Sequence, residues 1–323
     1  MTTFGNNSLR TRRSLMGYAV AAVVLSITWA QTSAAQPLNA GLLAVSVGTK
    51  PMSDAALAQG KTVMLDAWFN SQQRVNSAGE KEYFHYKWND TTNSGFSTLG
   101  SIFTGFGASL DTLYSAPTKE KLKSARYYII VSPDIPVKNP HPNYVQPEDA
   151  EQVAEWVEQG GVLLLMENDP ANADIDHLDL IADRFGLHFN DVLSHHVIGD
   201  DFAAGQIAVT GGGPLFHSPH SLYMKDTCTL SLKPPATSLL EDKGDIMIAF
   251  AKYGKGTVVA IVDPWLYNEY AGKDKTRPGQ DNYAAGTEFV RWLLMQGQRS
   301  AKTAAMLPKM PRPKGPVIDG GAL

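Results

Sequence analysis

The chain has 323 residues, of which 43% are hydrophobic and 19% are charged, and its formal net charge at pH 7 is -4. This composition is that of an ordinary globular protein, and the length suits one large domain or two small ones. The central part of the chain has no stripe of basic residues, so nucleic acid is not expected as a partner.

The N-terminal segment 1–35 has the pattern of an export signal. Arg10, Arg12 and Arg13 form a positive segment, an apolar run follows at 15–29, and small residues at 33–35 suit cleavage. The arginine pair is also similar to a twin-arginine signal, and an uncleaved anchor is the alternative. We therefore expect a periplasmic or secreted protein with no stable membrane span after cleavage.

Composition also divides the rest of the chain. Residues 36–60 are polar and rich in small side chains, which indicates a linker, whereas 298–323 are rich in Pro, Lys, Gly and Ala, which indicates a disordered tail. One α/β domain is expected over 61–297. The chain has one cysteine, Cys228, so an intrachain disulfide is impossible, and a buried structural thiol is favoured over a nucleophile.

Short apolar runs bounded by turn residues predict the strands of this domain. The clearest runs cover residues 62–66, 109–113, 127–132 and 162–166. Shorter strands are expected at 187–189, 207–209, 222–224 and 238–240. A β-hairpin is predicted to join 246–253 to 257–262 through Gly254, Lys255 and Gly256.

Segments with apolar residues at helical spacing predict the helices. They cover residues 95–106, 118–124, 147–159, 175–185 and 283–295. Asn93 and Ser94 are expected to cap the first of them. An aromatic segment after the first strand, 67–92, is expected to fold as a long excursion over the strand ends.

The order of these elements predicts the fold class. Strand 127–132, the following helix and strand 162–166 form a βαβ unit, and each strand ends in acidic or amide residues. The domain is predicted to be a three-layer, flavodoxin-like α/β sheet with an antiparallel β addition near the C-terminus. Ligands of such sheets bind outside the carboxyl ends of the strands.

Four stretches carry a resemblance to a known family. They are residues 84–88 with 92–96, 128–134, 160–169 and 263–270. Together they resemble the class I glutamine-amidotransferase-like domain that accompanies bacterial unsaturated rhamnogalacturonyl hydrolases. The resemblance covers about 60–297. It implies a class I amidotransferase-like fold and a role near pectin-derived or similar acidic oligosaccharides.

The chain departs from true amidotransferases at the nucleophile. Their catalytic cysteine lies in a tight strand-to-helix turn. The corresponding strand ends of this chain carry Ser132-Pro133-Asp134 and Glu167-Asn168-Asp169, and Cys228 lies in no such turn. We therefore expect no glutaminase activity. The helical barrel of the hydrolases is absent from the sequence as well, so their activity is not transferred.

Acidic residues at the predicted strand ends are the candidate catalytic groups. Asp134, Glu167 and Asp263 would supply the acid and base of glycoside cleavage, and His85 would assist proton transfer. The alternative is that Asp134 and Asp263, which lie beside prolines, only shape turns.

The candidate substrate-binding residues are aromatic side chains for stacking on sugar rings and polar ones for reading hydroxyl groups. They are Trp88, Asn93, Asn168, Asp169, Trp265, Asn268 and Tyr270. A buried aromatic cluster and simple helix capping are the alternatives. No metal or cofactor is expected, because His177, His188, His195 and His196 form no recognised ligand motif.

Two functions remain open at this point. The first is an exported carbohydrate-active protein of plant-polysaccharide utilisation, a glycosidase-type hydrolase acting on unsaturated or acidic oligosaccharides. The second is a non-catalytic sugar-binding or scaffold module that kept the amidotransferase-like fold without the nucleophile. The oligomeric state is not indicated by the sequence.

Overall fold

The structure is a computed structural model that describes residues 54–272 and 279–298. The expected export signal, most of the expected linker and all but the first residue of the expected tail lie outside the described residues. Leu57 and Ala58, next to the short 3-10 helix η1 (Asp54–Ala56), are buried against the domain core. The packed part of the chain therefore begins before residue 61.

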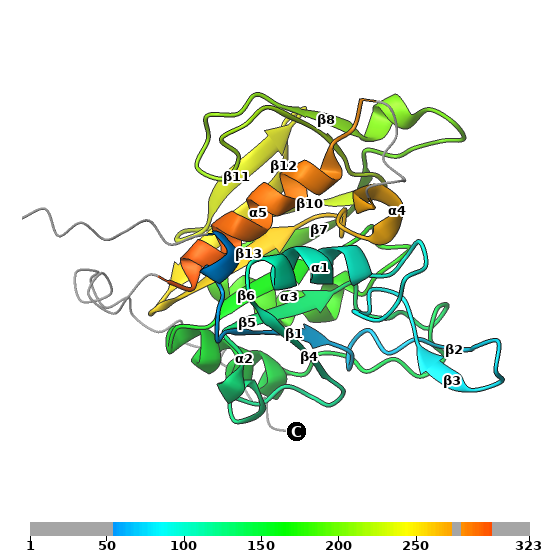
Figure 1. Ribbon diagram of the computed structural model, residues 1–323, viewed down its shortest axis with the longest axis vertical. Coiled ribbons are helices and arrows are strands. Elements are labelled where there is room, and N and C mark those ends of the chain that lie inside the picture. Colours follow the sequence, from blue (N-terminus) through cyan, green and yellow to red (C-terminus); the bar gives the residue numbers. More distant parts are fainter. Residues whose placement is uncertain (1–53, 273–278, 299–323) are drawn as a thin grey trace, which may run out of the picture. The chain divides into compact units, whose positions relative to one another are not determined.

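A mostly parallel sheet of seven strands forms the centre of the domain (Figure 1). Five strands run parallel: β4 (Ser109–Leu113), β1 (Thr62–Asp66), β5 (Tyr127–Val131), β6 (Val162–Met166) and β13 (Gly256–Ile261). Two antiparallel strands, β12 (Asp245–Tyr253) and β11 (Thr237–Asp242), extend the sheet beyond β13. The spatial order is β11-β12-β13-β6-β5-β1-β4.

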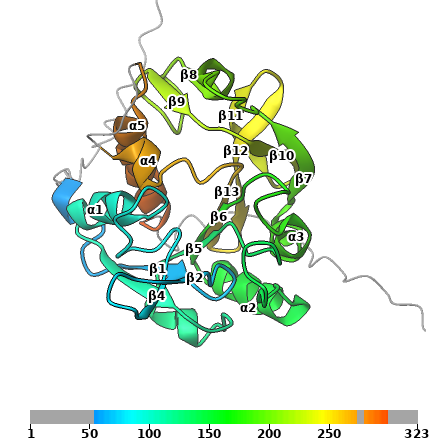
Figure 2. The ribbon, with the colours of Figure 1, turned by 90° about the vertical axis from the view of Figure 1, so that its right-hand side faces the viewer.

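Helices cover both faces of this sheet (Figure 2). One face carries α1 (Ser97–Gly105), the short α4 (Asn268–Ala271) and α5 (Asn282–Gln296), and the other carries α2 (Pro147–Glu158) and α3 (Ile175–Ala182). Every residue of β5, β6 and β13 is buried, which is why these strands have continuous apolar sequences. The mixed α/β fold with an antiparallel addition is confirmed.

Two neighbouring tyrosines of β5 connect the central strand to both layers. Successive side chains of a strand point to opposite faces. The Tyr127 hydroxyl donates to the carbonyl oxygen of Leu294 in α5 at 2.7 Å. The Tyr128 ring packs edge-on against Trp156 of α2, and its hydroxyl donates to Asp66 at 2.8 Å.

Smaller strand pairs surround the main sheet. The excursion after β1 contains a hairpin of β2 (Gln73–Val75) and β3 (Lys81–Tyr83). After α3 the chain forms the pair β7 (Leu187–Ser194) and β10 (Thr227–Leu232), and the pair β8 (Gln206–Val209) and β9 (His220–Tyr223). Short 3-10 helices lie at η2 (Lys121–Ser124), η3 (Asp183–Phe185) and η4 (Phe202–Gly205).

Two sequence expectations about these elements are corrected. The strand β10 was not predicted; it contains Cys228, which is buried as expected. The helix α1 begins two residues later than predicted, and its first turn is capped from a distance: the amide of Thr98 donates to Asn268 Oδ1 at 2.9 Å. Within residues 54–272 and 279–298, no helix has the length and apolar character needed to cross a membrane.

Candidate functional site

The carboxyl ends of the parallel strands bring the predicted catalytic acids to one edge of the sheet. Val131 of β5 and Ile261 of β13 both lie beside Met166 of β6 in register. The next residues therefore meet at this edge: the Ser132 amide donates to the Met166 carbonyl at 2.8 Å, and the Glu167 amide donates to the Ile261 carbonyl at 2.9 Å. We call this edge the carboxyl rim; Asp66, Asp134, Glu167 and Asp263 lie on it.

Asp134 is held by hydrogen bonds from the protein itself. Its Oδ2 accepts from the Ser71 amide and from Asn139 Nδ2, both at 2.8 Å. Its Oδ1 accepts from Gln72 Nε2 at 2.8 Å, and the residue is 1% exposed. The carboxylate thus joins the start of the excursion to the proline-rich loop after β5. This arrangement agrees with the structural alternative that acids beside proline shape turns.

A buried lysine lies in the same region, and the sequence did not mark it. Lys87 is 2% exposed, and its Nζ donates to the carbonyl and Oδ1 of Asn70, both at 2.8 Å, and to the His85 carbonyl at 3.1 Å. Burial lowers the pKa of Lys87 to about 8, although the charges of Asp66 and Asp134 oppose that shift. The lysine ties the excursion to the end of β1.

Asp66, the last residue of β1, is wholly buried, and both of its carboxylate oxygens accept hydrogen bonds. Its Oδ2 accepts from the Phe69 amide at 2.8 Å, and its Oδ1 accepts from Tyr128 Oη at 2.8 Å. Burial raises the pKa of Asp66 to about 6, against the effect of these hydrogen bonds and of Lys87. Asp66 therefore shapes the turn that starts the excursion.

Glu167 and Asp263 are rim acids whose pKa values are raised by burial. Burial raises the pKa of Asp263 to about 8 and raises the pKa of Glu167 well above its ordinary value. Asp263 Oδ2 accepts from the Lys225 amide at 2.8 Å. Glu167 Oε1 accepts from the Asn168 amide at 2.9 Å, whereas the buried Oε2 has no hydrogen-bond partner among the described residues.

Strained backbone gathers where the excursion meets the rim. His85, Tyr86 and Ser132 have φ values of 64°, 56° and 43°, in the left-handed region that non-glycine residues rarely occupy. The buried Tyr86 side chain hydrogen-bonds to Asn168 and Ser132. Such outliers concentrate at functional sites, because the surrounding structure must compensate their cost.

His85 lies on this strained segment with its ring stacked on Tyr86, the two ring centroids 4.0 Å apart. Burial, together with the positive charges of Lys138 and Lys87, lowers the pKa of His85 to about 3. The imidazole is therefore neutral at physiological pH, and it is not a ready proton donor.

Several predicted substrate-binding side chains lie in the core. Trp265 is 0% exposed and packs edge-on against Phe289, so in this conformation it offers no face to a sugar ring. Asn268 Nδ2 donates to the carbonyl oxygens of Asp90 and Thr92 at 3.0 and 2.8 Å. Asn268 therefore holds the loop before α1, and its role here is structural.

The other predicted binding residues divide between loops and the rim. Tyr270 is nearly buried, with its ring 4.7 Å from that of Tyr267. Trp88 is partly exposed, and its Nε1 donates to the Asp111 carbonyl at 3.0 Å. The backbone carbonyl oxygen of Asn93 accepts a hydrogen bond from the Glu269 amide at 2.8 Å.

Asn168 and Asp169 form a turn directly after Glu167. The Asp169 amide donates to Asn168 Oδ1 at 2.9 Å. Asp169 Oδ1 in turn accepts from the Ala171 amide at 3.0 Å, and its Oδ2 accepts from Asn172 Nδ2 at 2.5 Å. Asn168 remains half-buried at the rim, whereas Asp169 is committed to the turn.

Each of the four histidines named in the sequence contacts one or two carboxylates of its own. His177 contacts Asp174, and His188 contacts Asp183. The neighbours His195 and His196 contact different acids, Asp242 and Asp226. Among the described residues, no group of three or more histidine, cysteine or acidic side chains has the arrangement of a metal site.

Fold and rim together define an α/β protein whose central parallel sheet carries a buried polar network at its carboxyl end. A comparison with protein-family models found no matching family, and a comparison with curated proteins found no similar sequence.

Solved structures are similar to this chain in fold. The mmIFT52 N-terminal domain is 15% identical with a TM-score of 0.53, over 75% of this chain and 99% of that chain. The cytoplasmic protein STM3548 from Salmonella typhimurium is 14% identical with a TM-score of 0.46, over 73% and 98%. The exo-beta-1,4-mannosidase Op5Man5 from Opitutaceae bacterium strain TAV5 is 14% identical with a TM-score of 0.41, over 71% and 35%.

Proposed function

We propose that this protein is a carbohydrate-binding module with a flavodoxin-like, class I amidotransferase-like domain and no glutaminase activity. The strand order supports this fold class. Across the sheet, from β4 to β13, the five parallel strands are the second, first, third, fourth and fifth of them along the chain. This 2-1-3-4-5 order is the flavodoxin-like one. The absence of a cysteine at the end of β5, where Ser132 stands, supports the lack of glutaminase activity.

The protonation and hydrogen bonding of the rim acids favour a binding function over hydrolysis. Glycoside cleavage needs one protonated and one ionised carboxyl group facing the substrate. Here Asp134 is fully engaged by protein donors, burial raises the pKa of Asp263 to about 8 and so keeps it mostly protonated near neutral pH, and burial also raises the pKa of Glu167. A rim of this kind offers hydrogen bonds to a ligand, while the carboxylate of Asp134 is already occupied by protein donors and is not free to act as a base.

The proposed ligand is an acidic oligosaccharide of the pectin type. Half-buried polar and aromatic side chains are available at the rim, among them Asn168, Tyr267 and Lys138. Burial lowers the pKa of Lys138, whereas the nearby acids Asp169 and Asp134 favour its protonated form. A uronate carboxylate would pair with Lys138, while ring hydroxyl groups would meet Asn168. Export and a role in plant-polysaccharide utilisation belong to the same proposal and depend on the sequence of the N-terminus and on the family resemblance.

Isothermal titration calorimetry with oligogalacturonides, unsaturated oligogalacturonides and neutral oligosaccharides tests this proposal. Wild-type protein is expected to bind the acidic ligands without turning them over. Lys138→Gln should weaken that binding about tenfold. The matched control is Lys255→Gln, which removes an exposed lysine from the β12–β13 turn. Failure of every oligosaccharide to bind at millimolar concentration would exclude a carbohydrate role.

Hydrolysis is the second candidate, and the geometry of Glu167 favours it. A buried carboxyl group with a raised pKa and an unpartnered oxygen has the properties of a general acid. Under this alternative, wild-type protein releases reducing ends from unsaturated oligogalacturonides, and Glu167→Gln abolishes the release while binding persists. Wild-type turnover in both Glu167→Gln and Asp134→Asn would exclude these residues as the acid and base.

A further inference from the structure

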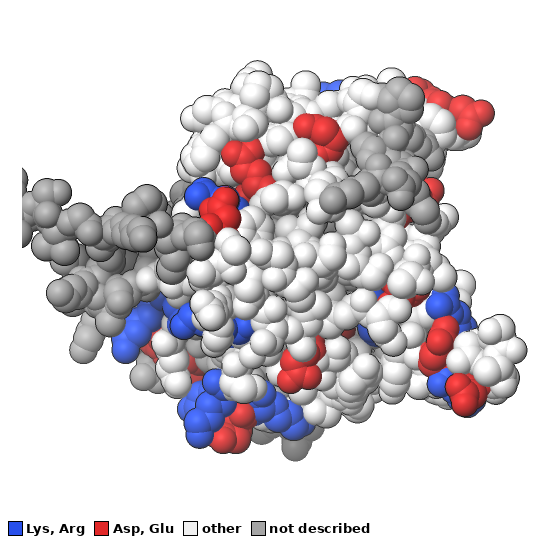
Figure 3. All heavy atoms as spheres, viewed as in Figure 1, with Lys and Arg blue, Asp and Glu red and all other residues white. Residues whose placement is uncertain are grey.

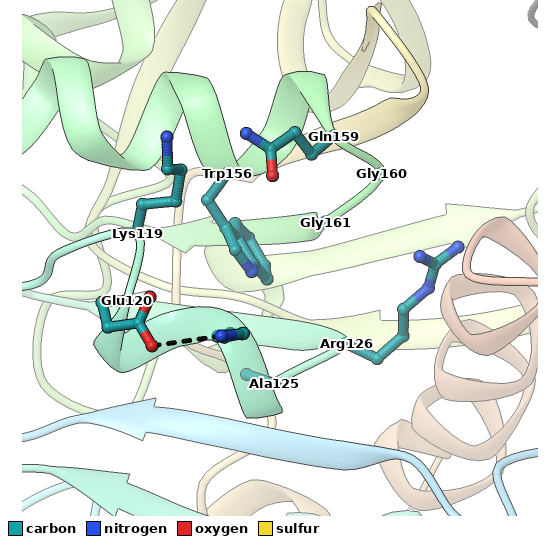
Figure 4. A pocket seen from close by; sticks show the side chains of 9 residues that line it. Lys119, Glu120, Ala125, Arg126, Trp156, Gln159, Gly160 and Gly161 are labelled. Atoms are coloured by element: carbon teal, nitrogen blue, oxygen red, sulfur yellow. Dashed lines mark hydrogen bonds and ion pairs between the residues drawn. The ribbon is translucent and has the colours of Figure 1, made fainter.

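A concave site lies at the amino end of the sheet, away from the carboxyl rim. It is a cavity of about 370 Å³ beside the points where β5 and β6 begin (Figure 4). The residues that line it are Lys119, Glu120, Lys123, Ala125, Arg126, Trp156, Gln159, Gly160 and Gly161. None of the predicted catalytic or binding residues is among them, so this cavity is a separate candidate site.

The polar lining of this amino-end cavity is mainly cationic. Its charged lining residues are three cations, Lys119, Lys123 and Arg126, and one acid, Glu120. Figure 3 shows basic side chains gathered at the lower left of the molecule, at the end of the sheet where Figure 1 places the start of β1. Negative charge on a ligand is therefore favoured here.

Within the described part of the chain, the side chains of both cavity lysines form exposed ion pairs. Lys123 Nζ lies 3.3 Å from Glu120 Oε1, with side chains 76% and 81% exposed. Lys119 Nζ lies 2.8 Å from Glu155 Oε2, outside the cavity lining. Exposed pairs of this kind contribute little to stability, so both ammonium groups can turn to an incoming anion at low cost.

Arg126 is the fixed cation of the cavity. Its Nε and Nη2 donate to the carbonyl oxygen of Gly297, at the end of α5, at 2.9 and 2.6 Å. Its Nη1 lies next to Gly160, where an added Cβ would be only 3.2 Å away. Glycine at 160, with a φ of 123°, therefore leaves the approach to Nη1 open. An oriented guanidinium matches the geometry of carboxylate and phosphate groups.

Trp156 gives the cavity an apolar wall. The indole Nε1 donates to the Leu122 carbonyl at 2.9 Å, which fixes the ring. The ring packs against Gly161, where an added Cβ would be 2.5 Å from ring carbon Cδ2. A flat apolar wall beside cations suits an anion attached to a carbon skeleton better than a bare inorganic ion.

We propose that the amino-end cavity binds a small organic anion. Its carboxylate or phosphate group pairs with Arg126 Nη1 and with the ammonium group of Lys123, and its carbon skeleton lies against Trp156. The cavity volume falls in the range of small-molecule sites, roughly 300 to 1,000 Å³. The proposal is independent of sugar binding at the carboxyl rim, because the two sites share no residue.

Calorimetric titration with four probes tests the site: galacturonate, glucose 6-phosphate, inorganic phosphate and galactose. We expect one or both organic anions to bind, inorganic phosphate to bind more weakly, and galactose not to bind. Comparison of the first two probes distinguishes a carboxylate ligand from a phosphate ligand. Arg126→Gln and Lys123→Gln should each weaken the binding about tenfold, and added salt should weaken it further.

Lys121→Gln is the matched control. Lys121 lies on the same 3-10 helix as Lys123 and donates to the Ala116 carbonyl at 2.8 Å, outside the cavity lining. This control should leave the affinity unchanged. An unchanged thermal midpoint of Lys123→Gln shows that its loss of affinity does not come from unfolding, even where Arg126→Gln loosens the end of α5. Three outcomes would overturn the proposal. Lys121→Gln could weaken binding as much as Lys123→Gln, galactose could bind as tightly as the anions, or neither organic anion could bind at millimolar concentration.

Discussion

The two ends of the parallel sheet treat charge in opposite ways. At the carboxyl rim, Lys87 and Asp134 are 2% and 1% exposed, and each makes at least three hydrogen bonds to the protein. At the amino-end cavity, the side chains of Lys123 and Glu120 are 76% and 81% exposed and meet in one long contact. Buried charges of the first kind determine the structure, whereas exposed charges of the second kind remain free to bind a ligand.

Electrostatics explains why substitutions of the buried and of the exposed charges should affect stability differently. A buried charge loses its hydration, so its hydrogen-bond partners must replace water, and removing one partner leaves the rest uncompensated. An exposed charge keeps its hydration and contributes little when paired. Substitutions at the two ends should therefore change stability by very different amounts.

Lys87→Met should cause the largest change. The substitution keeps the length of the side chain but removes the donor to Asn70 and His85, and it takes away the positive charge that interacts with Asp66 and Asp134. We expect a loss of about 3 to 5 kcal/mol in the free energy of unfolding, the range for breaking a buried ionic contact. Urea denaturation followed by circular dichroism measures it.

Lys121→Met serves as the control for this comparison. Lys121 is exposed, and its side chain donates to the Ala116 carbonyl. Its substitution should change stability by less than about 0.5 kcal/mol. A loss below about 1 kcal/mol for Lys87→Met would contradict the view that the rim charges are structural.

Asp134→Asn should cause the next largest loss, about 1 to 3 kcal/mol. Both carboxylate oxygens accept hydrogen bonds from protein donors, and an asparagine would turn its amide group toward one of those donors. Chemical denaturation at pH 7 provides the measurement. Asp111→Asn is a suitable control, because Asp111 is exposed on the edge strand β4. Equal stability of the two variants would show that Asp134 does not hold the excursion.

Asp263→Asn should change how stability depends on pH. The folded pKa of Asp263 is about 8, above the ordinary value of 3.8, so the folded protein binds more protons than the unfolded chain between these values. This residue therefore lowers stability as pH rises from about 4 to 8, by at most about 1.4 kcal/mol per pH unit. Removing the carboxyl group should flatten that decline. Denaturation curves at pH 5 and pH 7.5 measure it, and parallel declines in wild type and variant would refute the shifted pKa.

Much of the fold could be predicted from local patterns. The strands β5 and β6 are buried on both faces and therefore have continuous apolar sequences, and glycines mark the turn between β12 and β13. The strand β10 was not predicted, although its sequence, TCTLSL, alternates polar and apolar residues as a strand does. Its partner, β7, lies far away in the sequence, and no local pattern records such a pairing.

The sequence predicts where the candidate site lies, but not how its side chains are oriented. Acidic residues after parallel strands identified the rim, because strand ends of this kind meet at one edge. Sequence alone does not show which way a side chain points, so Trp265 was taken for a sugar platform although it packs against Phe289. Lys87 was missed for the same reason: a lysine in an aromatic segment is ordinarily exposed, and its burial depends on the distant Asn70 and Asp66.

Lys123→Gln should cause the smallest change of stability, and it tests the other half of the comparison. The side chain of Lys123 is exposed. Within the described residues, its ion pair is with Glu120. Its loss should change the free energy of unfolding by less than about 0.5 kcal/mol. The same variant should lose affinity for organic anions, so stability and binding would separate at this end of the sheet. A loss of stability comparable to that of Asp134→Asn would mean that the amino-end charges are structural as well, and the contrast between the two ends would disappear.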